Sequence, residues 1–156
     1  MGKIKYTVYI RTSNEKKAGT NEDVWVQLIG TNGETRSTHF DNGGYNDFEQ
    51  GDTDPYVIIS DDIGELTHVV VALTAEGSYA GTIDMTAEAA AKGVAVGWQF
   101  ADIVKWRSQH HSPSWHLDSI SVVPTDLFMN VQLGQGANFT LRGWIPCGTI
   151  AKITRD

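Results

Sequence analysis

The fold of this chain is decided by residues 18–33, A-G-T-N-E-D-V-W-V-Q-L-I-G-T-N-G, and by residues 39–54, H-F-D-N-G-G-Y-N-D-F-E-Q-G-D-T-D. In the first stretch Val24, Val26 and Leu28 recur at every second position, which predicts a half-buried β-strand. Asn, Asp, Gly and Thr are concentrated on both sides of this strand, and these residue types supply the oxygen ligands that calcium prefers. The sequence therefore predicts a strand between two loops, in a binding module whose function lies in the loops.

The period of two recurs elsewhere in the chain. Tyr6, Val8 and Ile10 alternate with polar neighbours, and the dipeptide Asn32-Gly33 predicts a tight hairpin turn. Further strands are expected over residues 35–40, 56–59, 66–73, 100–106, 115–123, 127–133 and 138–144. Many short strands separated by turn signals predict an all-β sandwich. Residues 76–98 interrupt the pattern, and a short helix is expected there, with Thr86 as its cap and Gly93 at its end.

Length and charge limit the functions that the chain can have. A chain of 156 residues fits a single domain, residues 1–156. The formal net charge of -7 disfavours nucleic acid as a partner, because binding phosphate requires a clustered basic face. The same charge would repel anionic lipid unless a bound cation offset it. The single cysteine, Cys147, excludes an internal disulfide.

The N-terminal residues alternate as in a strand and do not form the apolar run of a secretory signal. No stretch is long and apolar enough for a membrane span. We therefore expect a soluble protein that attaches peripherally to membranes, in the cytoplasm or after secretion; the sequence leaves the compartment open.

Several motifs, taken in order, resemble the PLAT domain of lipoxygenases, polycystins, pancreatic-type lipases and clostridial phospholipase C toxins. They are Y-T-V-Y-I-R-T-S, A-G-T-N-E-D-V-W-V-Q-L-I-G, F-E-Q-G-D-T-D-P-Y, D-D-I-G-E-L and S-P-S-W-H-L-D-S-I-S-V. The resemblance implies an eight-stranded antiparallel β-sandwich of two four-stranded sheets, interrupted by a partly helical insertion at about residues 75–100. It implies binding to membranes, lipid or protein, and no catalysis.

The resemblance also implies one calcium ion shared by the two donor-rich loops. Its ligands would be the carbonyl oxygens of Gly19 and Gly44 together with Thr20, Asp41, Asn42 and Asp47. The segment D-N-G-G-Y-N-D is most similar to the toxin version of this loop. Where many members have an acidic residue before A-G-T, this chain has Lys16 and Lys17, which implies that a second ion site is lost.

Five tryptophans are more than a core of this size needs, so some are candidates for a recognition surface. Trp115 and Trp144 fall in predicted strands, and we expect both in the core. Trp25 alternates away from its buried neighbours and Trp98 lies in or beside the insertion. These two are therefore predicted to form an exposed membrane or ligand surface.

The sequence predicts a non-catalytic module that binds calcium and attaches to a membrane or lipid surface. No G-x-S-x-G motif is present, and the paired acids fall in predicted turns, so an enzyme is disfavoured. The first alternative is a protein-recognition module with structural calcium or none. The second is a carbohydrate-binding sandwich that uses exposed tryptophans.

Overall fold

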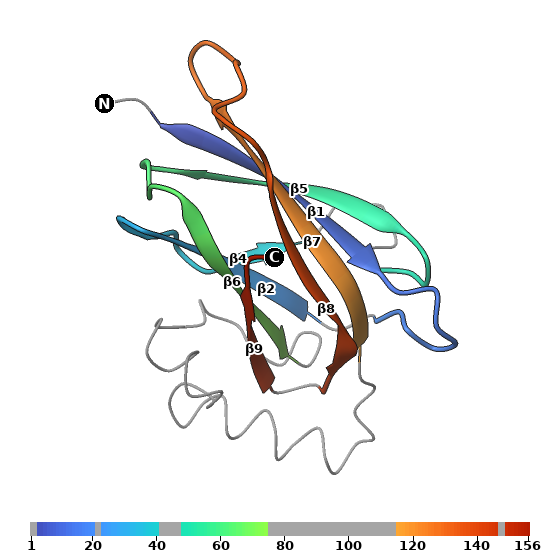
Figure 1. The fold of residues 1–156 in the computed structure, drawn as a ribbon. Helices are drawn as coiled ribbons and strands as arrows, with labels where there is room; N and C mark the ends of the chain where they lie inside the picture. Colours follow the sequence, from blue (N-terminus) through green and yellow to red (C-terminus); the bar gives the residue numbers. More distant parts are fainter. Residues whose placement is uncertain (1–2, 21–22, 41–47, 75–114, 147–148) are drawn as a thin grey trace.

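The protein is a sandwich of two antiparallel β-sheets packed face to face (Figure 1). The structure is a computed structural model, and it describes residues 3–20, 23–40, 48–74, 115–146 and 149–156. The predicted all-β sandwich is confirmed. The helix expected between Thr86 and Gly93, the strand expected over residues 100–106 and the insertion itself lie outside the described residues.

The first sheet has the strand order β5-β1-β7-β8. Its strands are β1 (Ile4–Thr12), β5 (Thr53–Ser60), β7 (Trp115–Asp126) and β8 (Ala137–Ile145). β1 pairs with β5 on one side and with β7 on the other. The predicted alternation of β1 is confirmed, because Tyr6, Val8 and Ile10 are buried between the sheets while Tyr9 and Arg11 face outward.

The second sheet has the order β3-β2-β6-β9, and β4 also pairs with β2. Its strands are β2 (Asp23–Gly30), β3 (Gly33–Glu34), β4 (Thr38–Phe40), β6 (Leu66–Thr74) and β9 (Thr149–Thr154). β6 occupies one side of β2, so β3 and β4 share the other side as two pieces of one edge strand. The resemblance implied two four-stranded sheets, and this broken edge accounts for the additional strand.

The break in the edge strand has a local cause at Thr35. The backbone N–H of Thr35 donates to the carbonyl of Leu28 at 2.9 Å, and its side-chain oxygen accepts from the N–H of Leu28 at 3.0 Å. The side chain of Gln27 in turn donates to the carbonyl of Thr35 at 3.0 Å. A buried hydroxyl thus replaces a backbone group of the ladder, which divides the strand predicted over residues 35–40.

The core between the sheets is built from the inward side chains of every long strand. Trp115, Phe139, Leu117, Ile120, Val8 and Ile10 are 0% exposed. Burial of these side chains is the main contribution to the stability of the fold, since each Å² of apolar surface removed from water contributes about 25 cal/mol. β6 is buried on both faces, because Val70 and Ala72 are 0% exposed although they alternate with the core residues Val69, Val71 and Leu73.

Two predictions about the C-terminal third are wrong. The strand expected over residues 127–133 is a loop, because the Asp126 carboxylate accepts from the N–H groups of Phe128 and Met129 and turns the chain. Trp144 was expected in the core, but it is 49% exposed because it occupies an outward position of β8. The core position of Trp115 is confirmed.

The strand-to-loop packing at Gly30 yields a prediction about stability. The loop before β6 lies directly over Gly30, and a Cβ added there would overlap the backbone carbonyl of Ile63. The same loop is bonded to the turn after β2, where Asn32 donates to the carbonyl of Ile63 at 2.8 Å. We therefore expect Gly30→Ala to lower the free energy of unfolding by about 2–4 kcal/mol, measured by urea denaturation.

Gly143→Ala is the matched control, because a Cβ at Gly143 meets the Leu141 side chain only at an ordinary 3.6 Å. Its effect on the unfolding free energy should stay within about 1 kcal/mol. Equal effects of the two substitutions would contradict the packing described for Gly30.

Candidate functional site

The candidate site lies at the end of the sandwich where β1 ends and β5 and β7 begin. We call this part the site end and define it as residues 12–20, residues 48–54 and Trp115. Backbone hydrogen bonds join its segments: Thr12 donates to Asp52 at 3.0 Å, Thr20 to Phe48 at 3.1 Å, and Gly51 to Ser13 at 3.1 Å. The two segments therefore form one unit, although they are more than 25 residues apart in the sequence.

Trp115 supports this unit from inside the core. Its indole N–H donates to the side-chain oxygen of Thr12 at 3.0 Å, and the edge of its ring contacts the ring of Phe48 at a centroid distance of 5.3 Å. A buried indole N–H without an acceptor would be costly, so this bond fixes the position of the last residue of β1. The core thus determines where both loops leave the sandwich.

Phe48 has a left-handed backbone with φ of 59°, which its surroundings maintain. Its N–H donates to the carboxylate of Asp54 at 2.8 Å, and its carbonyl accepts from Thr20. Gly19 lies so close that an added Cβ would be 3.0 Å from the Phe48 carbonyl oxygen. A side chain at residue 19 would press on the Phe48 carbonyl, so glycine favours the close approach of the two segments.

Asp54 is the acidic group that the sequence interpretation missed. It is 1% exposed, and although one carboxylate oxygen accepts from Phe48, the other, Oδ1, has no hydrogen-bond partner in the described parts of the chain. The residue closes the motif F-E-Q-G-D-T-D, and its place before Pro55 at the start of β5 could have distinguished it from the exposed Asp52. A buried carboxylate with an open oxygen is a strong potential ligand for a cation.

Two of the six predicted calcium ligands can be placed. Gly19 and Thr20 lie against Phe48, and Thr20 is 6% exposed. Asp41, Asn42, Gly44 and Asp47 lie outside the described residues. Within the described ranges, no three His, Cys, Asp or Glu side chains stand close enough to hold a metal ion together. Lys16 and Lys17 are exposed on the first loop.

The prediction that Trp25 is an exposed contact residue is wrong. Trp25 is 7% exposed, and its ring lies 5.0 Å from the ring of His39 on the neighbouring strand. It points away from the core, as expected, but the outer face of the second sheet is covered here, since Gln27 is also only 3% exposed. Trp98, the other predicted contact residue, lies outside the described residues.

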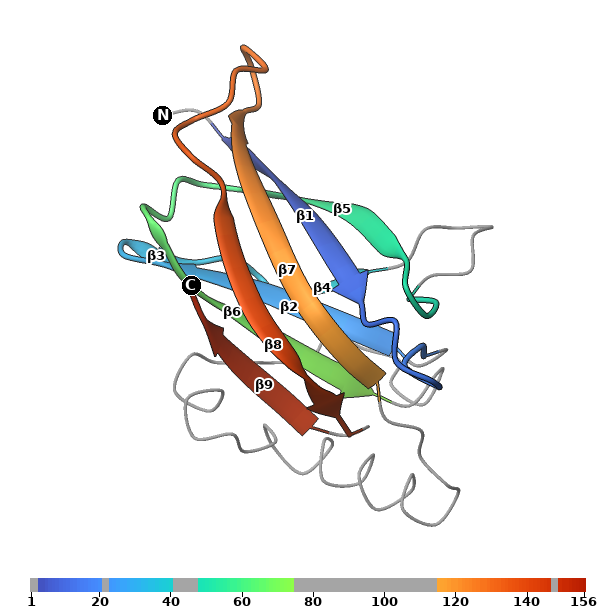
Figure 2. The ribbon, with the colours of Figure 1, turned by 45° about the vertical axis from the view of Figure 1, so that its right-hand side comes forward.

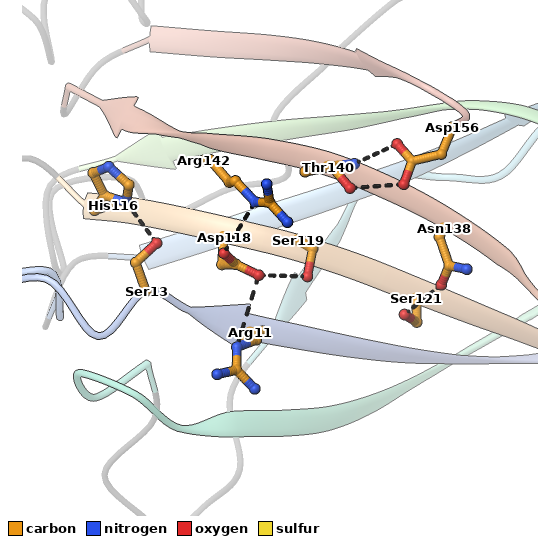
Figure 3. Close-up of polar contacts among 10 residues, drawn as sticks. All are labelled: Arg11, Ser13, His116, Asp118, Ser119, Ser121, Asn138, Thr140, Arg142 and Asp156. Carbon is orange, nitrogen blue, oxygen red and sulfur yellow. Dashed lines mark hydrogen bonds and ion pairs between the residues drawn. The ribbon is translucent and has the colours of Figure 1, made fainter.

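The outer face of the first sheet carries a row of polar contacts (Figure 3). Asp118 lies between Arg11 and Arg142, 3.7 Å from the Nε atom of each, and His116 Nδ1 lies 2.5 Å from the hydroxyl of Ser13. The arginines are largely exposed, so the ion pairs contribute little to stability. Ser13 is 6% exposed and therefore poorly placed as a nucleophile; its bond to His116 joins the end of β1 to the start of β7.

Most of this sequence matches the model of a known domain family. Residues 6–145 match the model of the PLAT/LH2 domain. The chain belongs to the PLAT/LH2 domain family. Among the residues that the structure describes, no helix has the length and apolar character needed to cross a bilayer.

One relative and two solved structures are similar to this chain. Lipoxygenase homology domain-containing protein 1 of Mus musculus is 35% identical over 78 residues, which is 50% of this chain and 4% of that protein. The coral 8R-lipoxygenase structure matches 97% of this chain and 17% of its own, with a TM-score of 0.61 and 16% identity. The Clostridium perfringens alpha-toxin matches 98% of this chain and 32% of its own, with a TM-score of 0.59 and 17% identity. This PLAT domain therefore spans only a small part of these longer relatives.

The role of Asp54 can be tested by two substitutions. Asp54→Ala leaves the N–H of Phe48 without an acceptor, whereas Asp54→Asn retains an oxygen for it and removes the buried charge. In calcium-free buffer we expect Asp54→Ala to be less stable than Asp54→Asn by about 1–3 kcal/mol, measured by urea denaturation. If the two variants unfold at the same urea concentration, the bond from Phe48 does not support the loop.

Proposed function

We propose that this PLAT domain is a calcium-binding module that attaches to a lipid surface through the site end. The observation that carries the proposal is Asp54, a buried acidic side chain with an unpartnered oxygen where the two loops meet. A carboxylate removed from water is costly unless a cation or hydrogen bonds compensate it. A cation bound at this end would give Asp54 Oδ1 the partner that it lacks in the described parts of the chain.

The residue types at this end fit calcium. Calcium takes about six to eight oxygen ligands, drawn from carboxylates, backbone carbonyls and amides. The carbonyls of Gly19 and Gly44 with Thr20, Asp41, Asn42 and Asp47 would supply most of them, and Asp54 adds an acidic group that the family resemblance did not nominate. The coral 8R-lipoxygenase with the same fold is described as activated by calcium through a C2-like domain.

The charges around the site end explain why attachment to anionic lipid would depend on the ion. The chain carries a formal net charge of -7, which opposes its approach to an anionic surface. Bound calcium would supply local positive charge that phosphate and carboxylate groups of lipids can approach. Lys16 and Lys17 are exposed on the first loop of the site end and add to this positive charge. Lys17 has a left-handed backbone with φ of 64°. In this proposal Trp98 remains the candidate aromatic contact.

Vesicle flotation tests the proposal. We expect the wild-type domain to bind vesicles of phosphatidylcholine and phosphatidylserine more tightly in calcium than in EDTA, because only the contact at the site end depends on the ion. Asp47→Ala should reduce the calcium-dependent part of vesicle binding at least about tenfold, because the substitution removes a proposed calcium ligand.

Asp61→Ala is the matched control for that experiment. Asp61 is an exposed acid, paired with Lys3 at the far end of the sandwich, so its loss should leave calcium-dependent flotation unchanged. Binding to anionic vesicles that is equal in calcium and EDTA, or that Asp47→Ala does not change, would contradict the proposal.

Protein recognition is the second candidate, and the outer face of the first sheet favours it. Tyr9, Val57 and Ile59 are 40%, 49% and 56% exposed, and β1 and β5 are adjacent strands that bring them together. Exposed apolar side chains grouped on one face are typical of interaction surfaces. Capture of a defined partner that persists in EDTA and is lost in the Tyr9→Ala, Val57→Ala double variant would support this function.

The carbohydrate alternative is weaker, because Trp25 is buried.

A further inference from the structure

A second exposed surface lies at the opposite end of the sandwich from the site end. The connection between β7 and β8 projects beyond both sheets at the top of Figures 1 and 2. We call residues 127–133, L-F-M-N-V-Q-L, the apolar loop. Phe128 is 96% exposed, Met129 72% and Val131 54%, and Leu127 and Leu133 are each more than 40% exposed. Five neighbouring apolar side chains are thus presented to solvent on one protruding turn.

The apolar loop is held in shape by its own hydrogen bonds. The carboxylate of Asp126 accepts from the N–H groups of Phe128 at 2.9 Å and Met129 at 2.8 Å, and the carbonyl of Asp126 accepts from Asn130 at 2.8 Å. The return segment is bonded back to β7, since Leu133 donates to the carbonyl of Pro124 at 2.9 Å. These bonds give the loop a defined backbone conformation, and that conformation holds the apolar side chains in solvent.

The polar groups of the loop are also largely satisfied within the protein. Leu127 donates to the carbonyl of Lys3, Asn130 accepts from Lys5 at 3.5 Å, and the side chain of Gln132 donates to the carbonyl of Gly134 at 2.9 Å. A segment can enter an apolar medium at low cost only if its backbone groups are bonded internally. This loop meets that condition at most of its N–H groups.

We propose that the apolar loop inserts into the surface of a neutral, phosphatidylcholine-type bilayer without calcium. Residues 127–133 contain no charged side chain, and the adjacent Asp126 carboxylate is bonded to the N–H groups of Phe128 and Met129, so the cost of bringing charge to the hydrocarbon is reduced. A protein groove is a poorer match, because specific protein interfaces use roughly one hydrogen bond per 100–200 Å² and this loop has few free donors to offer. Lys5 on β1 reaches Asn130 of the loop, and Lys3, just before β1, pairs with Asp61, so these amino groups lie at the base of the loop, where lipid phosphates would be.

The two ends of the domain act independently in this proposal. β7 runs from the site end to the apolar loop over 12 residues, which corresponds to roughly 40 Å at about 3.3 Å per residue. This separation is several times the screening length of about 8 Å at physiological salt, so an ion at the site end would not affect the loop. One flat bilayer cannot contact both ends, so the two contacts can be measured separately.

Cosedimentation with phosphatidylcholine vesicles in EDTA tests the loop. We expect wild type to bind, Phe128→Ala to weaken the partition coefficient about tenfold, and the Phe128→Ser, Met129→Ser double variant to abolish binding. Because both side chains are exposed, all variants should keep the wild-type melting temperature. Trp144→Ala is the matched control, an exposed aromatic on the outer face of β8, and should bind as wild type does.

A second measurement reports insertion directly. In Phe128→Trp, vesicles with brominated acyl chains should quench the fluorescence that the new tryptophan adds to that of the five native tryptophans, so quenching should be greater than in wild type. Absence of vesicle binding in EDTA, equal binding by wild type and the double serine variant, or no additional quenching in Phe128→Trp would each overturn the proposal. Loss of calcium-dependent flotation alone would overturn only the function of the site end.

Discussion

The burial of the Trp115 indole is the constraint on which the site end depends. The ring is 0% exposed, so its N–H must find a partner inside the protein, and it finds the hydroxyl of Thr12 at 3.0 Å. Its edge supports Phe48, whose strained backbone is bonded on one side to Asp54 and on the other to Thr20. The core therefore positions two distant loops against each other, and a buried acidic group lies where they meet.

The parts of the fold that could be predicted are those set by local alternation. β1 and β2 show it clearly, and each buries the residues that the pattern indicates. Trp25 was misjudged because alternation assigns it to the outer face but does not show whether that face is covered. The apolar run V-V-V-A-L in β6 carried the missing signal, since a strand buried on both faces implies that its neighbour is covered as well.

The remaining errors concern single polar side chains that redirect the backbone. Residues 127–133 are apolar enough for a strand, but one carboxylate, that of Asp126, caps two N–H groups and makes them a loop. Thr35 breaks the edge strand in a similar way. At the site end, composition predicted the donor-rich loops, but the burial of Asp54 follows from tertiary packing and could not be read from its neighbours. The structure thus describes a domain with two exposed ends of different chemistry, one acidic and one apolar.

The account depends most on whether the site end takes up calcium. Calorimetric titration of the wild-type domain with calcium measures this directly, with Asp41→Ala, Asp47→Ala and Asp54→Asn titrated alongside. We predict saturable binding of a single ion by wild type, with a dissociation constant on the order of micromolar to millimolar, and weaker binding by each variant. No heat of binding at millimolar calcium, or equal affinity in wild type and all three variants, would contradict the assignment of the site end.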